Sequence, residues 1–241
     1  MKHPIACALA LAIATSLAGC VTAPASTATP QAEAPMPADN PFFQPSPLQY
    51  GYPQFDKVEI AHFAPAFDRA MAEERAEVEA IANNPAPATF DNTIVAMERT
   101  GRMLGRVGAV FSGLNATNTN DAIQKLQADY APKFSAHSDA IMLNDKLWAR
   151  VKSVYDQRAT LGLDPAALRL VEKYHENFVR AGAALTPAQK ERVRAINSEL
   201  AGLQTKFSQN VLAEVNDSAV VVDDRAQLAG LSDKWIVVRH P

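Results

Sequence analysis

Apolar side chains recur at steps of three and four residues between positions 185 and 215, which is the period of an α-helix. Ahead of this stripe, Thr186 and Gln189 form a T-x-x-Q capping box, and Pro187 takes the first helical position. The pattern predicts a helix of about 30 residues, roughly 45 Å long. We expect neighbouring helices to pack along it and to bury the stripe, whose members are Val193, Ile196, Leu200, Leu203, Phe207 and Val211.

Similar patterns, bounded by caps and by glycine or proline, predict five further helices upstream. They are expected at 62–81, from about 89 to 111, from 121 with a bend at Pro132, from 144, and at 164–182. Short loops between them favour antiparallel neighbours. Gly101, Gly105 and Gly108 fall inside the second helix, and we interpret them as sites of close helix approach. The acidic residues between 73 and 79 are expected on the solvent side of the first helix.

The character of the sequence changes after residue 215. Residues 219–222 and 235–238 are rich in β-forming side chains and flank a Leu-Ala-Gly-Leu turn at 228–231. The predicted fold class is therefore all-α, with antiparallel helices along one long helix and a short β-rich C-terminal tail. A strand-like run at the end of the chain has no evident partner, so we expect the natural domain to continue beyond it.

The N-terminus is typical of a bacterial lipoprotein signal. Lys2 supplies a short positive region, an apolar run follows from 5 to 17, and Leu-Ala-Gly-Cys ends at Cys20. Cys20 is the predicted lipidation site, and a plain signal peptide with an incidental cysteine is the alternative. Val21, rather than Asp, favours sorting to the outer membrane, facing the periplasm. The predicted domains are the signal (1–20), a Pro/Ala-rich linker (21–48), a helical body (49–215) and the tail (216–241).

Charge and composition exclude some partners but assign no chemistry. The chain of 241 residues is 48% hydrophobic and 20% charged, as is ordinary for a globular protein. Without Lys2, 22 basic residues stand against 26 acidic ones after the signal, and no basic patch with aromatic residues occurs. Nucleic acid is therefore not an expected partner. The aromatic residues between 42 and 55 are interpreted as packing onto the body, with ligand binding as the alternative.

No catalytic or metal-binding constellation is predicted within these residues. Both cysteines precede the body, and the histidines at 62, 137 and 175 lie on separate predicted helices, as helix-face or core residues do. The run that begins His175-Glu176 ends at Val179, which cannot be a zinc ligand, so the H-E-x-x-H pattern fails. No G-x-S-x-G motif or P-loop occurs either.

Five runs, in order, resemble the N-terminal part of the thimet oligopeptidase-like zinc metallopeptidases, and most closely the bacterial peptidyl-dipeptidases. They are 59–67 (EIAHFAPAF), 87–101 (PATFDNTIVAMERTG), 114–120 (LNATNTN), 177–185 (NFVRAGAAL) and 207–212 (FSQNVL). The resemblance implies a helical wall of a deep channel that admits short peptides. It also implies zinc chemistry on an H-E-x-x-H helix in the C-terminal part, which none of these residues supplies.

The resemblance yields two functional hypotheses. The first is the N-terminal channel-wall region of a lipid-anchored periplasmic peptidyl-dipeptidase, lacking the catalytic half and inactive alone. The second is a non-catalytic helical lipoprotein that binds peptides or a protein partner. A separately encoded catalytic half is a further possibility. The end of the chain departs from the family pattern, since the strand-like run at 234–238 follows the turn at 228–231 almost at once.

Overall fold

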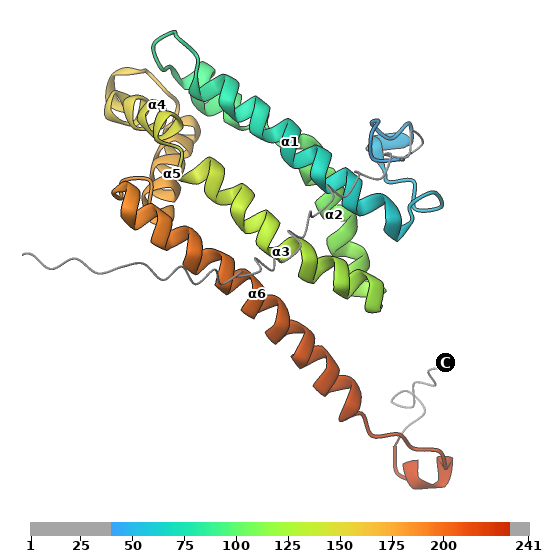
Figure 1. The fold of residues 1–241 in the computed structure, drawn as a ribbon. Coiled ribbons are helices and arrows are strands. Elements are labelled where there is room, and N and C mark those ends of the chain that lie inside the picture. Colours follow the sequence, from blue (N-terminus) through green and yellow to red (C-terminus); the bar gives the residue numbers. More distant parts are fainter. Residues whose placement is uncertain (1–39, 232–241) are drawn as a thin grey trace, which may run out of the picture. The chain divides into compact units, whose positions relative to one another are not determined.

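The computed structural model describes residues 40–231, which contain six α-helices and no β-strand (Figure 1). The helices are α1 (Phe63–Ala82), α2 (Arg102–Thr117), α3 (Asp121–Met142), α4 (Asp145–Asp156), α5 (Pro165–Ala181) and α6 (Pro187–Asp217). Short helical turns occur at Gln49–Gly51, Ile60–His62, Phe90–Val95, Arg158–Thr160 and Arg225–Leu228. Within this part of the chain, no helix is both long enough and apolar enough to cross a bilayer.

The first hydrophobic cluster joins α1, α2 and the N-terminal half of α3. Phe63 and Phe67 on α1 are almost fully buried, and their rings contact Phe111 of α2 at centroid distances of 5.2 and 5.4 Å. Tyr130 of α3 contacts Phe67 and donates a hydrogen bond of 2.8 Å to the Ala64 carbonyl. The pairs with Phe111 are edge-to-face and the Phe67–Tyr130 pair is tilted, and together these ring contacts hold the three helices to one another.

The second cluster joins the C-terminal end of α1 to α4 and α5. Its fully buried members include Leu147 and Val151 on α4 and Phe178 on α5. Buried Arg150 donates hydrogen bonds to the carbonyls of Asn84 and Ala86, and so ties α4 to the loop that follows α1. No residue of α6 belongs to either cluster of the described residues.

The expected second helix is in fact two elements. Thr89 caps a π-helical turn at Phe90–Val95, and α2 begins only after Gly101, whose φ of +67° breaks the helix. The close-approach interpretation of the glycines is wrong for Gly105 and Gly108, because a Cβ added there meets no atom within 4 Å. At Gly101 the positive φ strains any residue with a side chain, and an added Cβ would also lie 2.5 Å from the Glu74 carboxylate, which would have to shift.

The predicted β-rich tail is not supported. Residues 219–222 have no regular secondary structure, and the second β-rich run, at 235–238, lies outside the described residues. A strand is stable only when another strand accepts its backbone hydrogen bonds, and residues 40–231 provide none. Val220 and Val221 are consequently exposed.

The aromatic segment before α1 divides into two parts. Phe42 is buried against Phe63, at a centroid distance of 5.1 Å, which confirms packing onto the body for this residue. Tyr50, Tyr52 and Phe55 are exposed, and Tyr50 has a φ of +59°. For these three residues the packing interpretation is wrong.

Candidate functional site

The structure gives each histidine of the body a separate local role. His62 accepts the backbone N–H of Glu59 in a capping box, and His137 is buried with its Nε2 2.7 Å from Glu74. His175 stacks on Tyr155 at a centroid distance of 3.7 Å, and burial lowers its pKa. Within residues 40–231 no group of three or more His, Cys, Asp or Glu side chains could hold a metal ion. Cys20 lies outside the described residues.

The prediction that the acidic residues of α1 point to solvent is wrong for Glu74. Its carboxylate turns inward to His137 and is only 17% exposed, whereas Glu73 stays at the surface in an ion pair with Arg69. The acidic run was expected to point to solvent, because only one face of a helix can be buried. Glu74 lies on that buried face itself, three residues after Met71 and four before Val78, and there the imidazole of α3 offers a partner for the carboxylate.

The feature most indicative of function is the exposed apolar side of α6. We call Ile196, Leu200, Leu203, Phe207 and Val211 the α6 stripe. Their exposed fractions run from 38% for Ile196 to 70% for Phe207. Soluble proteins seldom leave a contiguous row of large apolar side chains in water, and such rows mark interaction surfaces. The expectation that neighbouring helices bury this stripe is therefore wrong.

The separate prediction that this stretch forms one long helix is confirmed. Helix α6 has 31 residues, Thr186 and Gln189 form the capping box, and Pro187 takes the first helical position. Gly182, with a φ of +100°, ends α5 as expected, and Asp164 caps its start. The prediction of the helix is therefore correct, and only the prediction of which face of α6 is covered is wrong.

A different, mostly polar side of α6 packs on α3. The buried and half-buried residues of this side are Lys190, Arg194, Asn197, Ala201, Thr205 and Gln209. Asn197 donates a 2.7 Å hydrogen bond to Asp139, and Gln209 donates one of 2.8 Å to the Gln124 carbonyl. Because residue numbers rise along α6 as they fall along α3, the two helices are antiparallel. At about 100° per residue, this side and the α6 stripe lie roughly 120° apart.

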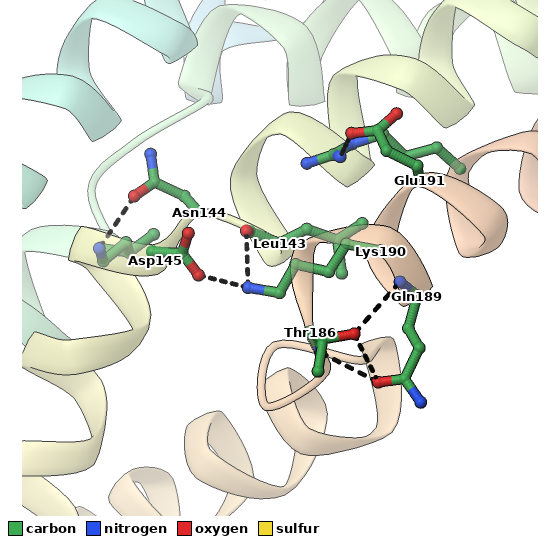
Figure 2. A network of polar contacts seen from close by, with 9 residues as sticks. Leu143, Asn144, Asp145, Thr186, Gln189, Lys190 and Glu191 are labelled. Atoms are coloured by element: carbon green, nitrogen blue, oxygen red, sulfur yellow. Dashed lines mark hydrogen bonds and ion pairs between the residues drawn. The ribbon is translucent and has the colours of Figure 1, made fainter.

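A buried lysine holds the first turn of α6 in place (Figure 2). The Lys190 ammonium donates to the Leu143 carbonyl at 3.2 Å and to Asp145 Oδ1 at 2.5 Å. Leu143 follows the last turn of α3 and Asp145 opens α4, so one side chain joins three helices. The Lys190 side chain is 4% exposed, and a cation beside the C-terminal carbonyls of α3 is favourably placed in that helix dipole.

The sequence contains a second row of residues with helical spacing, which corresponds to the side of α6 that packs on α3. The α3-facing residues also recur at steps of three and four, from Lys190 to Gln209. A polar row of this kind is typical of an exposed face, so periodicity alone assigns the burial to the apolar stripe. Only the partners on α3, Asp139 and Gln124 among them, show that the polar row is the packed one.

Comparison with known proteins identifies relatives over most of the chain. The chain is 43% identical over 199 residues to dipeptidyl carboxypeptidase of Escherichia coli, and 42% identical to that of Salmonella typhimurium. Each alignment covers 83% of this chain and 29% of the relative. Oligopeptidase A of Escherichia coli is 25% identical over 194 residues, which is 80% of this chain and 28% of the relative. No protein-family model matches.

These relatives confirm the class of protein that the five sequence runs indicate. The chain is homologous to the N-terminal portion of the thimet oligopeptidase-like peptidases. Within that class it is more similar to dipeptidyl carboxypeptidase, at 43%, than to oligopeptidase A, at 25%. The chain spans about three tenths of the length of the curated relatives it matches.

Proposed function

We propose that these residues form the channel-wall part of a zinc-dependent peptidyl-dipeptidase that degrades short peptides, and that the catalytic residues lie outside the 241 residues. The observation that carries the proposal is the 43% identity to dipeptidyl carboxypeptidase over 83% of the chain. The α6 stripe supports it independently, since a part of a larger assembly keeps an apolar face for the rest of that assembly.

The described residues do not fit a zinc site. No three potential ligands gather within 40–231, and His175 lies in an aromatic stack rather than in a ligand cluster. The proposal therefore assigns zinc binding and water activation to the catalytic part. The role left to this chain is to shape the channel, to limit which peptides enter it, and to position the catalytic part.

A chimeric enzyme tests this role. The region of the Escherichia coli dipeptidyl carboxypeptidase that aligns with this chain is replaced by the matching 199 residues of the chain. We expect the chimera to bind zinc and to release a dipeptide from an N-blocked tripeptide, whereas the chain alone releases none. A chimera with native circular dichroism and full zinc content but no hydrolysis would contradict the proposal, and so would hydrolysis by the chain alone.

We further propose that Cys20 is lipidated and tethers the body to the outer membrane, facing the periplasm, through the linker at 21–48. The support is the Leu-Ala-Gly-Cys sequence at the end of an apolar run, with Val21 after it. Two or more acyl chains are needed for stable anchoring. Labelled palmitate should enter the wild-type chain but not Cys20→Ser, and the label should fractionate with outer membranes. Equal labelling of both, or a soluble wild-type chain, would refute the anchor.

The alternative function, a non-catalytic lipoprotein that binds peptides or a partner, would use the same exposed surface. The chimeric enzyme distinguishes this binding function from the channel-wall function. If the chain binds short peptides by itself but cannot replace the aligned region of the enzyme, the binding function is favoured over the channel wall.

A further inference from the structure

A groove lies between α1, α2 and α3, on the side of α3 that is turned away from α6. Its volume is about 300 Å³, and its mostly apolar lining includes the rings of Phe67, Phe111 and Phe134. His137 also lines the groove, whereas Asp139, two residues further along α3, accepts a hydrogen bond from α6. Side chains two residues apart on a helix point about 200° apart, so these two leave α3 on nearly opposite sides. The groove is therefore separate from the α6 stripe, which the proposed function leaves for the catalytic part.

Small residues on one face of α2 keep this groove open. Gly105, Gly108 and Ser112 follow one another at steps of three and four and so share a face of the helix. A Cβ added at Gly105 or Gly108 meets no atom within 4 Å, so no other part of residues 40–231 fills the space beside them. Small side chains alone are compatible with an empty surface, and a ligand is indicated only by a further feature of the groove.

That further feature is an unpaired nitrogen of His137. The side chain is 6% exposed, and its Nε2 lies 2.7 Å from Glu74 Oε2. Its Nδ1 is buried and has no hydrogen-bond partner within residues 40–231. Buried polar atoms of folded proteins are nearly always paired, because an unpaired one has lost its hydrogen bond to water without replacement. A molecule in the groove can supply the missing partner.

The Glu74 carboxylate determines which partner Nδ1 requires. An ionised carboxylate only accepts hydrogen bonds, so the proton is on Nε2 and Nε2–H donates to Glu74. Nδ1 of the neutral imidazole is then an acceptor, and its partner must be an N–H or O–H group. Gly101 allows Glu74 to keep this position, because a Cβ at Gly101 would lie 2.5 Å from the carboxylate.

We propose that this groove binds a small aromatic molecule with one N–H or O–H donor, such as an indole or a phenol. The aromatic ring contacts Phe67, Phe111 and Phe134 in the edge-to-face or offset arrangements that ring pairs prefer, and the donor bonds to His137 Nδ1. A volume of about 300 Å³ is at the lower end of the range for ligand sites and suits one ring or two fused rings. The site does not rest on the proposed function, because α1, α2 and α3 supply all of its residues.

Indole and benzofuran test the hydrogen bond to His137. The two molecules have the same shape, but benzofuran has an oxygen atom in place of the N–H group. NMR titration of the isotopically labelled full chain should show that indole binds about tenfold more tightly, because only indole can donate to Nδ1. The Nδ1 resonance of His137 should move to that of a hydrogen-bonded nitrogen with indole and not with benzofuran. Equal affinities, or binding of neither molecule, would overturn the proposal.

Matched leucine variants of α2 test the location of the site. Gly108→Leu places a side chain in the groove and should abolish indole binding. Gly113→Leu is the control, because a Cβ there also meets no atom within 4 Å, but Gly113 does not line the groove and lies about 140° around α2 from Gly108. Both variants gain helix propensity, so the circular dichroism of each should be that of the folded chain. Binding that survives Gly108→Leu, or that is lost equally in Gly113→Leu, would place indole elsewhere and overturn the proposal.

Replacing the carboxylate tests the role of Glu74. Glu74→Gln keeps the shape of the side chain, but an amide can either donate to His137 Nε2 or accept from it, so Nδ1 is no longer held as an acceptor. The preference for indole over benzofuran should therefore fall toward equality. A merely structural role of Glu74 would leave that preference unchanged, and this result would overturn the assignment of Nδ1 as the acceptor. None of these results bears on the chimeric enzyme, whose activity tests the channel wall whether or not the groove holds a ligand.

Discussion

Helices α1 and α6 carry apolar stripes of the same period, but the stripe of α1 is buried and that of α6 is exposed. On α1, Phe63 and Phe67 are exposed by no more than 1% and sit among rings from α2 and α3. On α6, Leu203 and Phe207 are more than half exposed. Within the described residues, α1 contributes to both hydrophobic clusters and α6 to neither.

The difference shows that an amphipathic helix can be held by its polar side. Helix α6 is fixed by the Lys190 contacts at its first turn and by amide hydrogen bonds from Asn197 and Gln209 further along. Hydrogen bonds of this type contribute about 1 kcal/mol each, less than a buried aromatic ring. They are directional, however, and set the rotation of α6, so that the apolar stripe remains available for association.

The largest effect should come from truncating matched phenylalanines on the two helices. Phe67→Ala removes a ring that contacts four other aromatic rings and should lower the free energy of unfolding by about 3–5 kcal/mol. Phe207→Ala should change it by less than about 0.5 kcal/mol. Urea denaturation followed by circular dichroism measures both. Similar losses for the two variants would mean that the α6 stripe is buried in the free chain.

Replacing the buried lysine of α6 tests the polar attachment. Lys190→Met keeps the length of the side chain but leaves the Leu143 carbonyl without its ammonium donor, and should cost about 1–3 kcal/mol. Lys206→Met, at an exposed lysine of the same helix, is the control and should be close to neutral. Chemical denaturation of the two variants gives the comparison. A neutral Lys190→Met would show that α6 is not held by this contact.

Removing the helix cap should have a smaller effect. Thr186→Ala deletes the hydroxyl that accepts the Gln189 N–H and should destabilise the chain by about 1 kcal/mol. Hydrogen exchange should show the loss in the first turn of α6 rather than in α1. Thr186→Ser retains the hydroxyl and should behave like wild type. Equal loss of protection in α1 would indicate that the two regions unfold together.

The smallest effect expected is a pH dependence that arises on α5. Burial lowers the pKa of His175 below its ordinary 6.5; Asp156 opposes this shift, whereas Lys152 and Arg158 reinforce it. The unfolded chain then takes up a proton before the folded chain does, so the free energy of unfolding is highest above pH 6.5 and falls below it. His175→Phe preserves the stack on Tyr155 and should flatten this fall. Stability curves of equal slope between pH 5 and 7 would contradict the assignment.

Capping residues in the sequence predict the starts of several helices correctly. Asn144, Asp164 and Thr186 each cap a helix as their sequence context predicts, because the capping hydroxyl, amide or carboxylate acts on backbone N–H groups only two or three residues away. The break at Gly101 is not predicted by neighbouring residues, because its partners lie on α1. The Glu74 carboxylate of α1 occupies the space where a side chain would stand, and Glu77 accepts the Gly101 N–H.

Apart from the break at Gly101, the sequence by itself determined where the helices lie, the caps at Asn144, Asp164 and Thr186, and the kinship with oligopeptidases, because each depends on neighbouring residues or on ordered runs. Only the tertiary structure decided which face of α6 is packed. That choice depends on Asp139, Gln124 and Leu143, which lie more than forty residues away along the chain. The spacing of apolar residues predicts which side of a helix would be stabilised by burial. The tertiary structure determines whether another part of the same chain covers that side.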